Sequence, residues 1–373
     1  MKNDDRIINA FFALLRAGLW ETDVRLLPFG INDYSILMAL AEEQSVVGLI
    51  ASGFEHVVDA KAPKEDVLQF VGQTLQIEQR NIAMNNFIAK ITEILRHASI
   101  YTILLKGQDV ALCYEKPLWR ASGDIDLFLS DDNYEKAKVI LAPFASVLEK
   151  EYAREKHLGM TINEFVVELH GRLSCGLSSR IERELDQVYK DTFFGGSVRS
   201  CYISGVQVFF LKVENDVFYV FTHILQHFYI DGVGLRQICD WSRLLWFYRE
   251  RIDLRLLEDR IKRAGLMTAW KALGAYAVDY LGMPVEAMPF YSDDKRWKRK
   301  AKRINKFVLS VGNMGHKRDK SYFGKYPYVI RKAISFGRRC GDLWKHARIF
   351  PMDSVRFFPA IVINGLKSAA RGE

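Results

Sequence analysis

Two short apolar runs, residues 103–105 and 125–129, follow an N-terminal region that is patterned for helices. Each run is too short for a helix and is bounded by a polar, glycine-containing turn, which is typical of a buried strand. Helical periodicity follows each run, over residues 109–115 and 134–141, with Asp131 as the expected N-cap of the second helix. The sequence therefore predicts an α+β fold, in which a small sheet lies among many helices.

The remaining patterns divide the chain into regions. Helical periodicity covers residues 6–97 and returns over residues 214–282. Between them, alternation in residues 157–170 around an Asn163-Glu164 turn predicts a β-hairpin, and residues 201–211 add two apolar segments, so we expect a mixed sheet. The expected regions are an N-terminal helical region at 1–97, a sheet-containing domain at 98–212, a helical domain at 213–290 and a basic, aromatic-rich tail at 291–373.

Asp124 and Asp126 stand two positions apart at the start of the second apolar run. Side chains alternate along a strand, so both carboxylates project from one face while Ile125 and Leu127 point into the core. Two carboxylates on one face repel each other unless a cation binds between them. The alternative to a metal site is that this pair lies at a solvated strand end. Hard divalent ions such as Mg²⁺ or Mn²⁺ bind such oxygen ligands together with substrate phosphates. We therefore predict that this pair holds a metal.

A third acid, Glu168, lies among the apolar residues of the predicted hairpin, and His170 shares its face. If this strand lies beside the strand of Asp124 and Asp126, three carboxylates converge and can hold two metal ions. The alternative for Glu168 is a place at a sheet edge. His170 is a candidate for contact with the substrate.

Cationic and small residues flank the acids. Lys106 and Arg120 are candidates for binding phosphates, and the alternative is that both pair with the carboxylates. Gly107 and Gly123 allow close approach of the backbone. Ser122 either donates a hydrogen bond to a phosphate or serves the turn. These five residues complete the predicted substrate site.

These motifs resemble an uncharacterised bacterial nucleotidyltransferase family within the polymerase-beta-like nucleotidyltransferase superfamily. The resemblance rests on Lys-Gly after a strand, on Arg shortly before Gly-Asp-Ile-Asp-Leu, and on a later Glu-Leu-His. It extends over roughly residues 70–285 and includes these positions of the helical segment: His223, His227, Leu235, Arg236, Asp240, Leu244 and Leu245. The superfamily usually has Gly-Ser in the turn before the Asp-x-Asp strand, where this chain has Lys106-Gly107.

The resemblance implies a polymerase-beta-like core at residues 98–212 and transfer of a nucleoside monophosphate from a nucleoside triphosphate such as ATP to a hydroxyl acceptor, with release of pyrophosphate. It implies that Asp124 and Asp126 ligate Mg²⁺ or Mn²⁺ and that Glu168 is the third acid, which polarises the acceptor hydroxyl. The acceptor stays open among a protein side chain, a tRNA end, a small alcohol and a sugar intermediate. Synthesis of surface polysaccharide is one candidate setting.

The charge is divided unevenly along the chain. Residues 291–373 hold 21 Lys and Arg against 6 Asp and Glu, a net +15, which leaves −7 for residues 1–290 out of the total of +8. A basic tail on an acidic body suggests an anionic partner, either a membrane surface or nucleic acid, and a solvated helix face is the alternative. The alternative function is a catalytically silent nucleotide-binding or scaffold protein that docks through this tail.

Other classes lack their motifs. The sequence has no Walker A loop, no G-x-G-x-x-G and no G-x-S-x-G. Its five cysteines form no C-x-x-C pair, which argues against a disulfide framework or a zinc site. His223 and His227 are four apart on a predicted helix, and their apolar flanks favour a packed or hydrogen-bonded helix face over metal binding. Without a signal peptide or a spanning segment we expect a cytoplasmic protein, or one peripheral at the inner membrane face.

Overall fold

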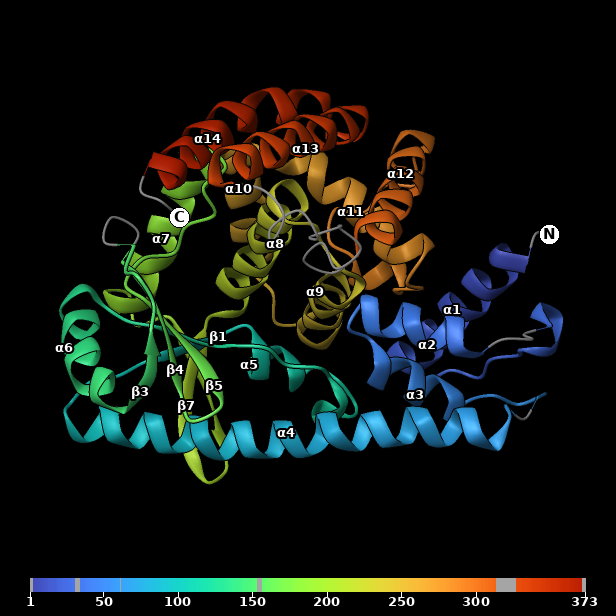
Figure 1. The fold of residues 1–373 in the computed structure, drawn as a ribbon, viewed down its shortest axis with the longest axis horizontal. Coiled ribbons are helices and arrows are strands. Elements are labelled where there is room, and N and C mark those ends of the chain that lie inside the picture. Colours follow the sequence, from blue (N-terminus) through green and yellow to red (C-terminus); the bar gives the residue numbers. More distant parts are fainter. Residues whose placement is uncertain (1–2, 31–33, 61, 153–155, 313–326, 371–373) are drawn as a thin grey trace.

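The computed structural model describes residues 3–30, 34–60, 62–152, 156–312 and 327–370, and over these residues it contains one sheet of seven strands (Figure 1). The strands lie in the order β3-β4-β5-β2-β1-β7-β6. They are β1 (Ile103–Leu105), β2 (Ile125–Phe128), β3 (Ala145–Leu148), β4 (His157–Ile162), β5 (Phe165–His170), β6 (Val198–Ile203) and β7 (Val206–Leu211).

The sheet is mixed, as predicted. Strand β2 pairs with β5 in parallel and with β1 in antiparallel, and β1 pairs with β7 in parallel. The predicted hairpin at 157–170 is β4 and β5, in which Ile162 faces Phe165 across a two-residue turn. The central strand β2 is buried along its whole length. A strand with neighbours on both sides and helices on both faces holds its side chains rigidly, which suits it to carry a site.

Helices cover both faces of the sheet and extend beyond it at both ends of the chain. They are α1 (Asn3–Trp20), α2 (Tyr34–Glu43), α3 (Val47–Glu55), α4 (Lys64–His97), α5 (Gly107–Ala111), α6 (Asp131–Leu141), α7 (Ser179–Phe193), α8 (Val213–Ile230), α9 (Leu235–Tyr248), α10 (Leu254–Ala264), α11 (Met267–Asp279), α12 (Lys295–Val311), α13 (Tyr328–Ile349) and α14 (Pro351–Ala370). The helical character predicted for residues 6–97 and 214–282 is confirmed.

Helix α4 joins the N-terminal helices to the sheet. It has 34 residues, and its buried side chains recur every three or four positions, which gives it one apolar face. Near its start Phe70 packs against Phe54 of α3, with ring centroids 5.1 Å apart. Further along, Phe87 stacks on Phe165 of β5 at the same distance. The helix therefore extends from the N-terminal helices to the sheet, as Figure 1 shows.

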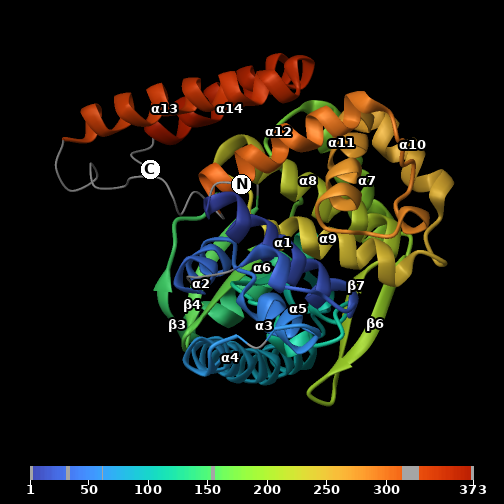
Figure 2. The same ribbon diagram turned by 90° about the vertical axis from the view of Figure 1, so that its right-hand side faces the viewer.

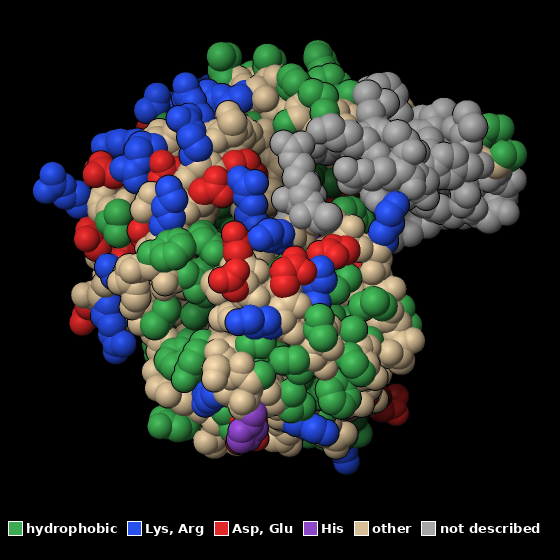
Figure 3. All heavy atoms as spheres, turned by 90° about the vertical axis from the view of Figure 1, so that its left-hand side faces the viewer, with side chains coloured by type: hydrophobic (Ala, Val, Ile, Leu, Met, Phe, Trp, Pro, Cys, Tyr) green, Lys and Arg blue, Asp and Glu red, His purple; other side chains and the backbone are tan. Residues whose placement is uncertain are grey.

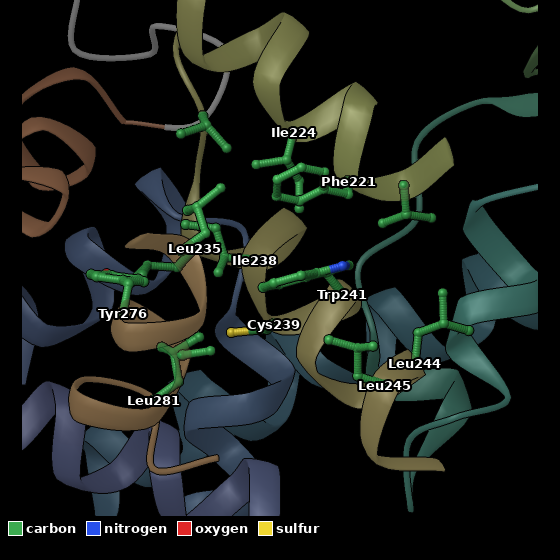
Figure 4. Close-up of a cluster of buried hydrophobic side chains, with 14 of the residues drawn as sticks. Phe221, Ile224, Leu235, Ile238, Cys239, Trp241, Leu244, Leu245, Tyr276 and Leu281 are labelled. Atoms are coloured by element: carbon green, nitrogen blue, oxygen red, sulfur yellow. The ribbon is translucent and has the colours of Figure 1, made fainter. Parts of the chain in front are cut away.

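The sheet separates two hydrophobic cores. Ile125 and Leu127 of β2 point, as predicted, into the core that α4 and α6 cover. The other core is formed largely by α1, α8, α9 and α11, with Trp241 near its middle (Figure 4). The ring of Trp241 lies 5.3 Å from Phe221 and 4.8 Å from Trp270. Because side chains alternate along β2, Asp126 faces the side of the sheet opposite to Ile125 and Leu127.

Two local predictions were wrong and one helix was not predicted. The helix expected over 109–115 begins at Gly107, directly after the turn at Lys106, and ends at Ala111. The N-cap of α6 is Ser130, and Asp131 is the first helical residue. Helix α7 was not predicted, although Ser178 caps it by accepting a hydrogen bond from the backbone N–H of Ile181.

The described part of residues 291–373 is helical and packs on the body of the protein. Phe307 of α12 and Phe357 of α14 lie 4.8 Å and 5.1 Å from the rings of Phe228 and Tyr229 of α8. Helices α13 and α14 lie side by side (Figure 2). Among the described residues no helix has both the length and the apolar character that crossing a membrane requires.

Candidate active site

Asp124, Asp126 and Glu168 meet on neighbouring strands. Strands β2 and β5 are parallel and in a register that sets Asp126 directly beside Glu168. Asp124 is the residue before β2. One carboxylate oxygen from each of the three lies within 4.8 Å of the others. The strand neighbourhood on which the three-acid prediction depended is therefore present.

Charge repulsion within this carboxylate group is large. The side chain of Asp126 is only 2% exposed. Two like charges at this separation repel by roughly 3–4 kcal/mol at an effective dielectric constant of about 20. The negative charge of Asp126, and then burial, raise the pKa of Asp124 above its usual range. A divalent cation would relieve this repulsion, so the donor set fits the metal predicted for it.

Lys106 supplies one positive charge to the group. Lys106 directly follows β1, and the last residue of that strand, Leu105, lies opposite Asp126. The Nζ of Lys106 is 3.1 Å from Asp126 Oδ1. Burial alone would lower the pKa of Lys106, but Asp126 and the nearby acids outweigh it and raise that pKa. Lys106 and Gly107 have φ of 50° and 49°, which a lysine adopts only under strain. The strained turn brings the lysine back over the strand ends.

Two imidazoles lie beside Glu168. The Nε2 of His170 is 2.8 Å from Asp126 Oδ1 and 3.5 Å from Glu168 Oε2, and the Nε2 of His157 is 3.1 Å from the same glutamate oxygen. Burial alone would lower the pKa of His170, but these carboxylates raise it to about 8. Burial alone would raise the pKa of Glu168, but the imidazoles hold it below its usual range. Glu168 is therefore ionised at neutral pH.

Arg120 is held by a partner that the sequence did not reveal. Its Nε and Nη2 donate to the two oxygens of Asp240 in α9 at 2.8 and 2.7 Å, and its Nη1 donates to Ser122 Oγ at 3.2 Å. Asn81 of α4 donates to the carbonyls of Leu118 and Arg120 at 2.7 and 2.8 Å. These contacts fix the loop that leads to Gly123 and Asp124. The phosphate contact of Arg120 stays a prediction.

A family comparison adds to this geometry. The model of a family described as uncharacterised nucleotidyltransferase matches residues 32–282. The chain belongs to this nucleotidyltransferase family. The match begins about forty residues before the range that the motifs alone indicated and ends at the close of the second helical segment. Comparisons with curated proteins and with solved structures found no match.

Membership of a nucleotidyltransferase family supports transferase activity, and such enzymes generally take a nucleoside triphosphate and a divalent metal. The carboxylate group of Asp124, Asp126 and Glu168 lies within the matched residues, as do Lys106 and Arg120. Glycine 123 is exposed, and a Cβ added there would meet no atom within 4 Å. The loop before Asp124 therefore leaves room for a ligand.

Sequence reasoning did not assign three residues to this candidate site. His157 was not singled out. His223 of α8 was expected on a packed or hydrogen-bonded helix face, and its Nε2 lies 3.1 Å from Lys106 Nζ. Burial followed by the charge of Lys106 lowers the pKa of His223 well below its usual value. Arg236 of α9 donates to the carbonyl of Ala121 at 2.9 Å, while its buried Nε has no hydrogen-bond partner.

Proposed function

We propose that this protein transfers a nucleoside monophosphate from a nucleoside triphosphate to a hydroxyl acceptor in a reaction that depends on Mg²⁺ or Mn²⁺. The acceptor oxygen bonds to the α-phosphorus, the bond from that phosphorus to the bridging oxygen of the β-phosphate breaks, and pyrophosphate leaves. One observation carries this proposal, namely three carboxylates that meet within 4.8 Å at adjoining strands in a nucleotidyltransferase family member.

Asp124, Asp126 and Glu168 would hold the metal. When bound, the ion neutralises charge on the phosphates and on the departing pyrophosphate. The protein's own part is to place the carboxylates on rigid, fully paired strands, so that little reorganisation is needed when substrate arrives. Glu168, which the two imidazoles keep ionised, can accept a hydrogen bond from the acceptor hydroxyl.

Lys106, Gly107, Ser122 and Gly123 would hold the triphosphate. Lys106 is charged and strained into place, and Gly107 and Gly123 lie on either side of the backbone of Asp124. We assign Arg120 a contact with phosphate only as an extension of its bond to Ser122, because its other donors are taken by Asp240. Rate enhancement would come from positioning and charge neutralisation.

Calorimetric titration of the four nucleoside triphosphates, with and without Mg²⁺, tests the proposal. Wild-type protein should bind one of them in a metal-dependent manner, and the variant Asp124→Asn/Asp126→Asn should not. Asp132→Asn, an exposed acid at the start of α6, is the matched control and should bind like wild type. Equal binding by wild type and the double variant would refute the assignment. Once the base is known, acceptor hydroxyls of sugars, tRNA and proteins can be screened for pyrophosphate release.

The surface of α13 and α14 supports the alternative function, which is a catalytically silent scaffold that docks through residues 291–373. Trp344, Met352 and Val355 are 64%, 73% and 73% exposed, and Arg348 and Arg356 are exposed near them. Apolar side chains among cations suit an anionic lipid surface. Elsewhere, acidic and basic side chains are interspersed on the face that Figure 3 shows.

Flotation with vesicles tests this docking. The protein should float with vesicles of anionic phospholipid, less so at high salt, and should stay in solution with vesicles of zwitterionic lipid. Replacing Trp344 and Val355 by Ala should reduce flotation. Equal behaviour with both vesicle types, or salt-sensitive binding to RNA alone, would count against a membrane role for the tail.

A further inference from the structure

His157 brings a second type of ligand to the carboxylate group. Strands β4 and β5 are antiparallel, with His157 directly opposite His170, and Glu168 stands two residues before His170. Directly paired side chains share a face of the sheet, and so do side chains two apart in one strand. Two imidazoles and one carboxylate therefore meet at one point of the face that also carries Asp126.

The separations match those of ligands around one metal ion. The Nε2 atoms of His157 and His170 lie 3.1 and 3.5 Å from Glu168 Oε2. Two ligand atoms, each about 2.0–2.1 Å from a tetrahedral zinc ion, are roughly 3.3–3.4 Å apart. The observed values lie on either side of this distance. One ligand atom from each of the three residues is within 4.8 Å of the others, so the three are close enough to hold one cation.

We propose that His157, His170 and Glu168 form a second metal site, which takes a divalent transition-metal ion such as Zn²⁺ or Co²⁺ and shares Glu168 with the Asp124–Asp126 site. Imidazole nitrogen binds Zn²⁺ and Co²⁺ well, whereas Mg²⁺ takes oxygen ligands. The two sites therefore differ in the metal that they select. The cysteine spacing that argues against a zinc site concerns thiolate ligands and does not bear on this one. The inference rests on the proposed function only through the shared Glu168.

The surroundings favour a cation over a simple pair of His–Glu contacts. The Nε2 of His170 is shared between two carboxylates, those of Asp126 and Glu168. A further acid lies over Gly159, the residue opposite Glu168, because a Cβ added at Gly159 would lie 2.4 Å from Glu149 Oε2. Asp126 and Glu168 thus contact the imidazoles, with Glu149 beside Gly159, and a divalent ion would add positive charge to this acidic group.

The site is open enough for an ion to enter. The side chains of His157 and Glu168 are each 25% exposed, and that of His170 is 12% exposed. A buried ion pair would have no such access, while a metal site needs a path from solvent. A metal ion bound at His170 Nε2 would replace the contact that this atom makes with Asp126 Oδ1 at 2.8 Å.

Cobalt titration of metal-free, full-length protein tests the proposal. Co²⁺ bound through imidazole nitrogen gives visible absorption bands, which need no enzymatic activity. Wild type should bind Co²⁺ with such bands, and Zn²⁺ should displace it. His157→Ala should weaken Co²⁺ binding by at least about tenfold, because removing even an outer partner of a metal ligand costs that much. Asp124→Asn should keep the bands, since Asp124 belongs to the other site.

His56→Ala is the matched control. His56 also pairs with a glutamate, at 2.8 Å from Glu21 Oε2, and that pair lies in a different part of the fold. This variant should bind Co²⁺ like wild type. The proposal would be overturned if wild-type protein lacked the visible absorption bands of Co²⁺ bound through imidazole nitrogen. An unchanged Co²⁺ affinity in His157→Ala would overturn it as well. His157→Gln gives the same test if the alanine variant does not fold.

A parallel titration separates this proposal from the proposed function. Mg²⁺-dependent nucleotide binding by wild type, lost in Asp124→Asn, reports on the carboxylate site alone. Cobalt bands that depend on His157, without any nucleotide binding, would support the second metal site and count against nucleotidyl transfer. Nucleotide binding in a protein whose Co²⁺ affinity does not depend on His157 would leave the proposed function standing and refute the second site.

Discussion

Two clusters of buried carboxylates in this protein are compensated in different ways. Away from the candidate site, Asp109 of α5 and Asp216 of α8 are each 1% exposed and accept hydrogen bonds from the same Nη2 of Arg199, at 2.6 and 2.5 Å. The other donors of this guanidinium go to the hydroxyl of Tyr248 and the carbonyl of Leu211, both at 2.6 Å. This cluster ties β6 to three helices and β7.

The candidate site differs in its excess of acid. Asp124, Asp126 and Glu168 face the single lysine Lys106, and Glu168 keeps a quarter of its side chain exposed. The two acids of the Arg199 cluster also repel each other, but they share one guanidinium and are closed off from solvent, whereas Glu168 of the candidate site remains reachable. The comparison teaches that burial of acids does not by itself mark a metal site. What marks one is negative charge that the protein leaves uncompensated and accessible.

Replacing one acid in each cluster should separate the two roles. Asp126→Asn should lower Mg²⁺-dependent affinity for the preferred nucleoside triphosphate by at least about 100-fold, because a direct ligand matters at least as much as its outer partners. Asp216→Asn should leave that affinity nearly unchanged. Calorimetry on both variants, with circular dichroism to confirm the fold, makes the measurement. Similar losses of nucleotide affinity in both variants would contradict the difference in role between the two clusters.

Replacing the cation of each cluster should separate stability from nucleotide binding. Arg199→Met leaves two buried carboxylates without a partner and should lower the free energy of unfolding by about 3–5 kcal/mol. Lys106→Met should cost less stability, because His170 still contacts Asp126 and Glu168 keeps a quarter of its side chain exposed, but it should abolish nucleotide binding. Urea denaturation of both variants checks the order. A Lys106 variant that is the less stable of the two would contradict the comparison.

Much of the site could be predicted because short segments of the sequence determine it. The Asp-x-Asp spacing and the short apolar runs indicate strands, and these were found. The same reasoning could have reached His157. With a two-residue turn at Asn163-Glu164, Ile162 pairs with Phe165, and counting outward pairs His157 with His170, as the structure has it. The signal was present in the predicted hairpin and was not used.

Other contacts could not be predicted, because they join residues that lie far apart in the chain. Arg120 and Asp240 are 120 positions apart, and Lys106 and His223 are 117 apart. Both contacts depend on how α8 and α9 pack on the sheet, which the core around Trp241 decides rather than any local pattern. Strand β3 and helix α7 were among the elements not predicted, and neither carries a motif with chemistry.

The ion pair of Arg120 with Asp240 is expected to give an intermediate effect. Lysine cannot donate two parallel hydrogen bonds, so Arg120→Lys should lower the free energy of unfolding by about 1.5–3 kcal/mol. If Arg120 acts by holding the loop before Asp124, Asp240→Asn should weaken nucleotide binding to a similar extent. If Arg120 itself contacts phosphate, Arg120→Lys should weaken binding much more than Asp240→Asn. Calorimetry on the two variants decides between these roles.

The smallest effect is a pH dependence that belongs to the Arg199 cluster. Burial, and then the charge of Asp109, raise the pKa of Asp216 well above its usual range. The folded state therefore binds this proton more tightly than the unfolded chain, whose aspartate pKa is about 3.9. The resulting stability is present below about pH 4 and is lost as the pH rises through the folded pKa. Asp216→Asn cannot ionise, so its free energy of unfolding should fall less than that of wild type between pH 4 and pH 8. Urea denaturation across this range measures the difference, and parallel curves would show that Arg199 fully compensates both carboxylates.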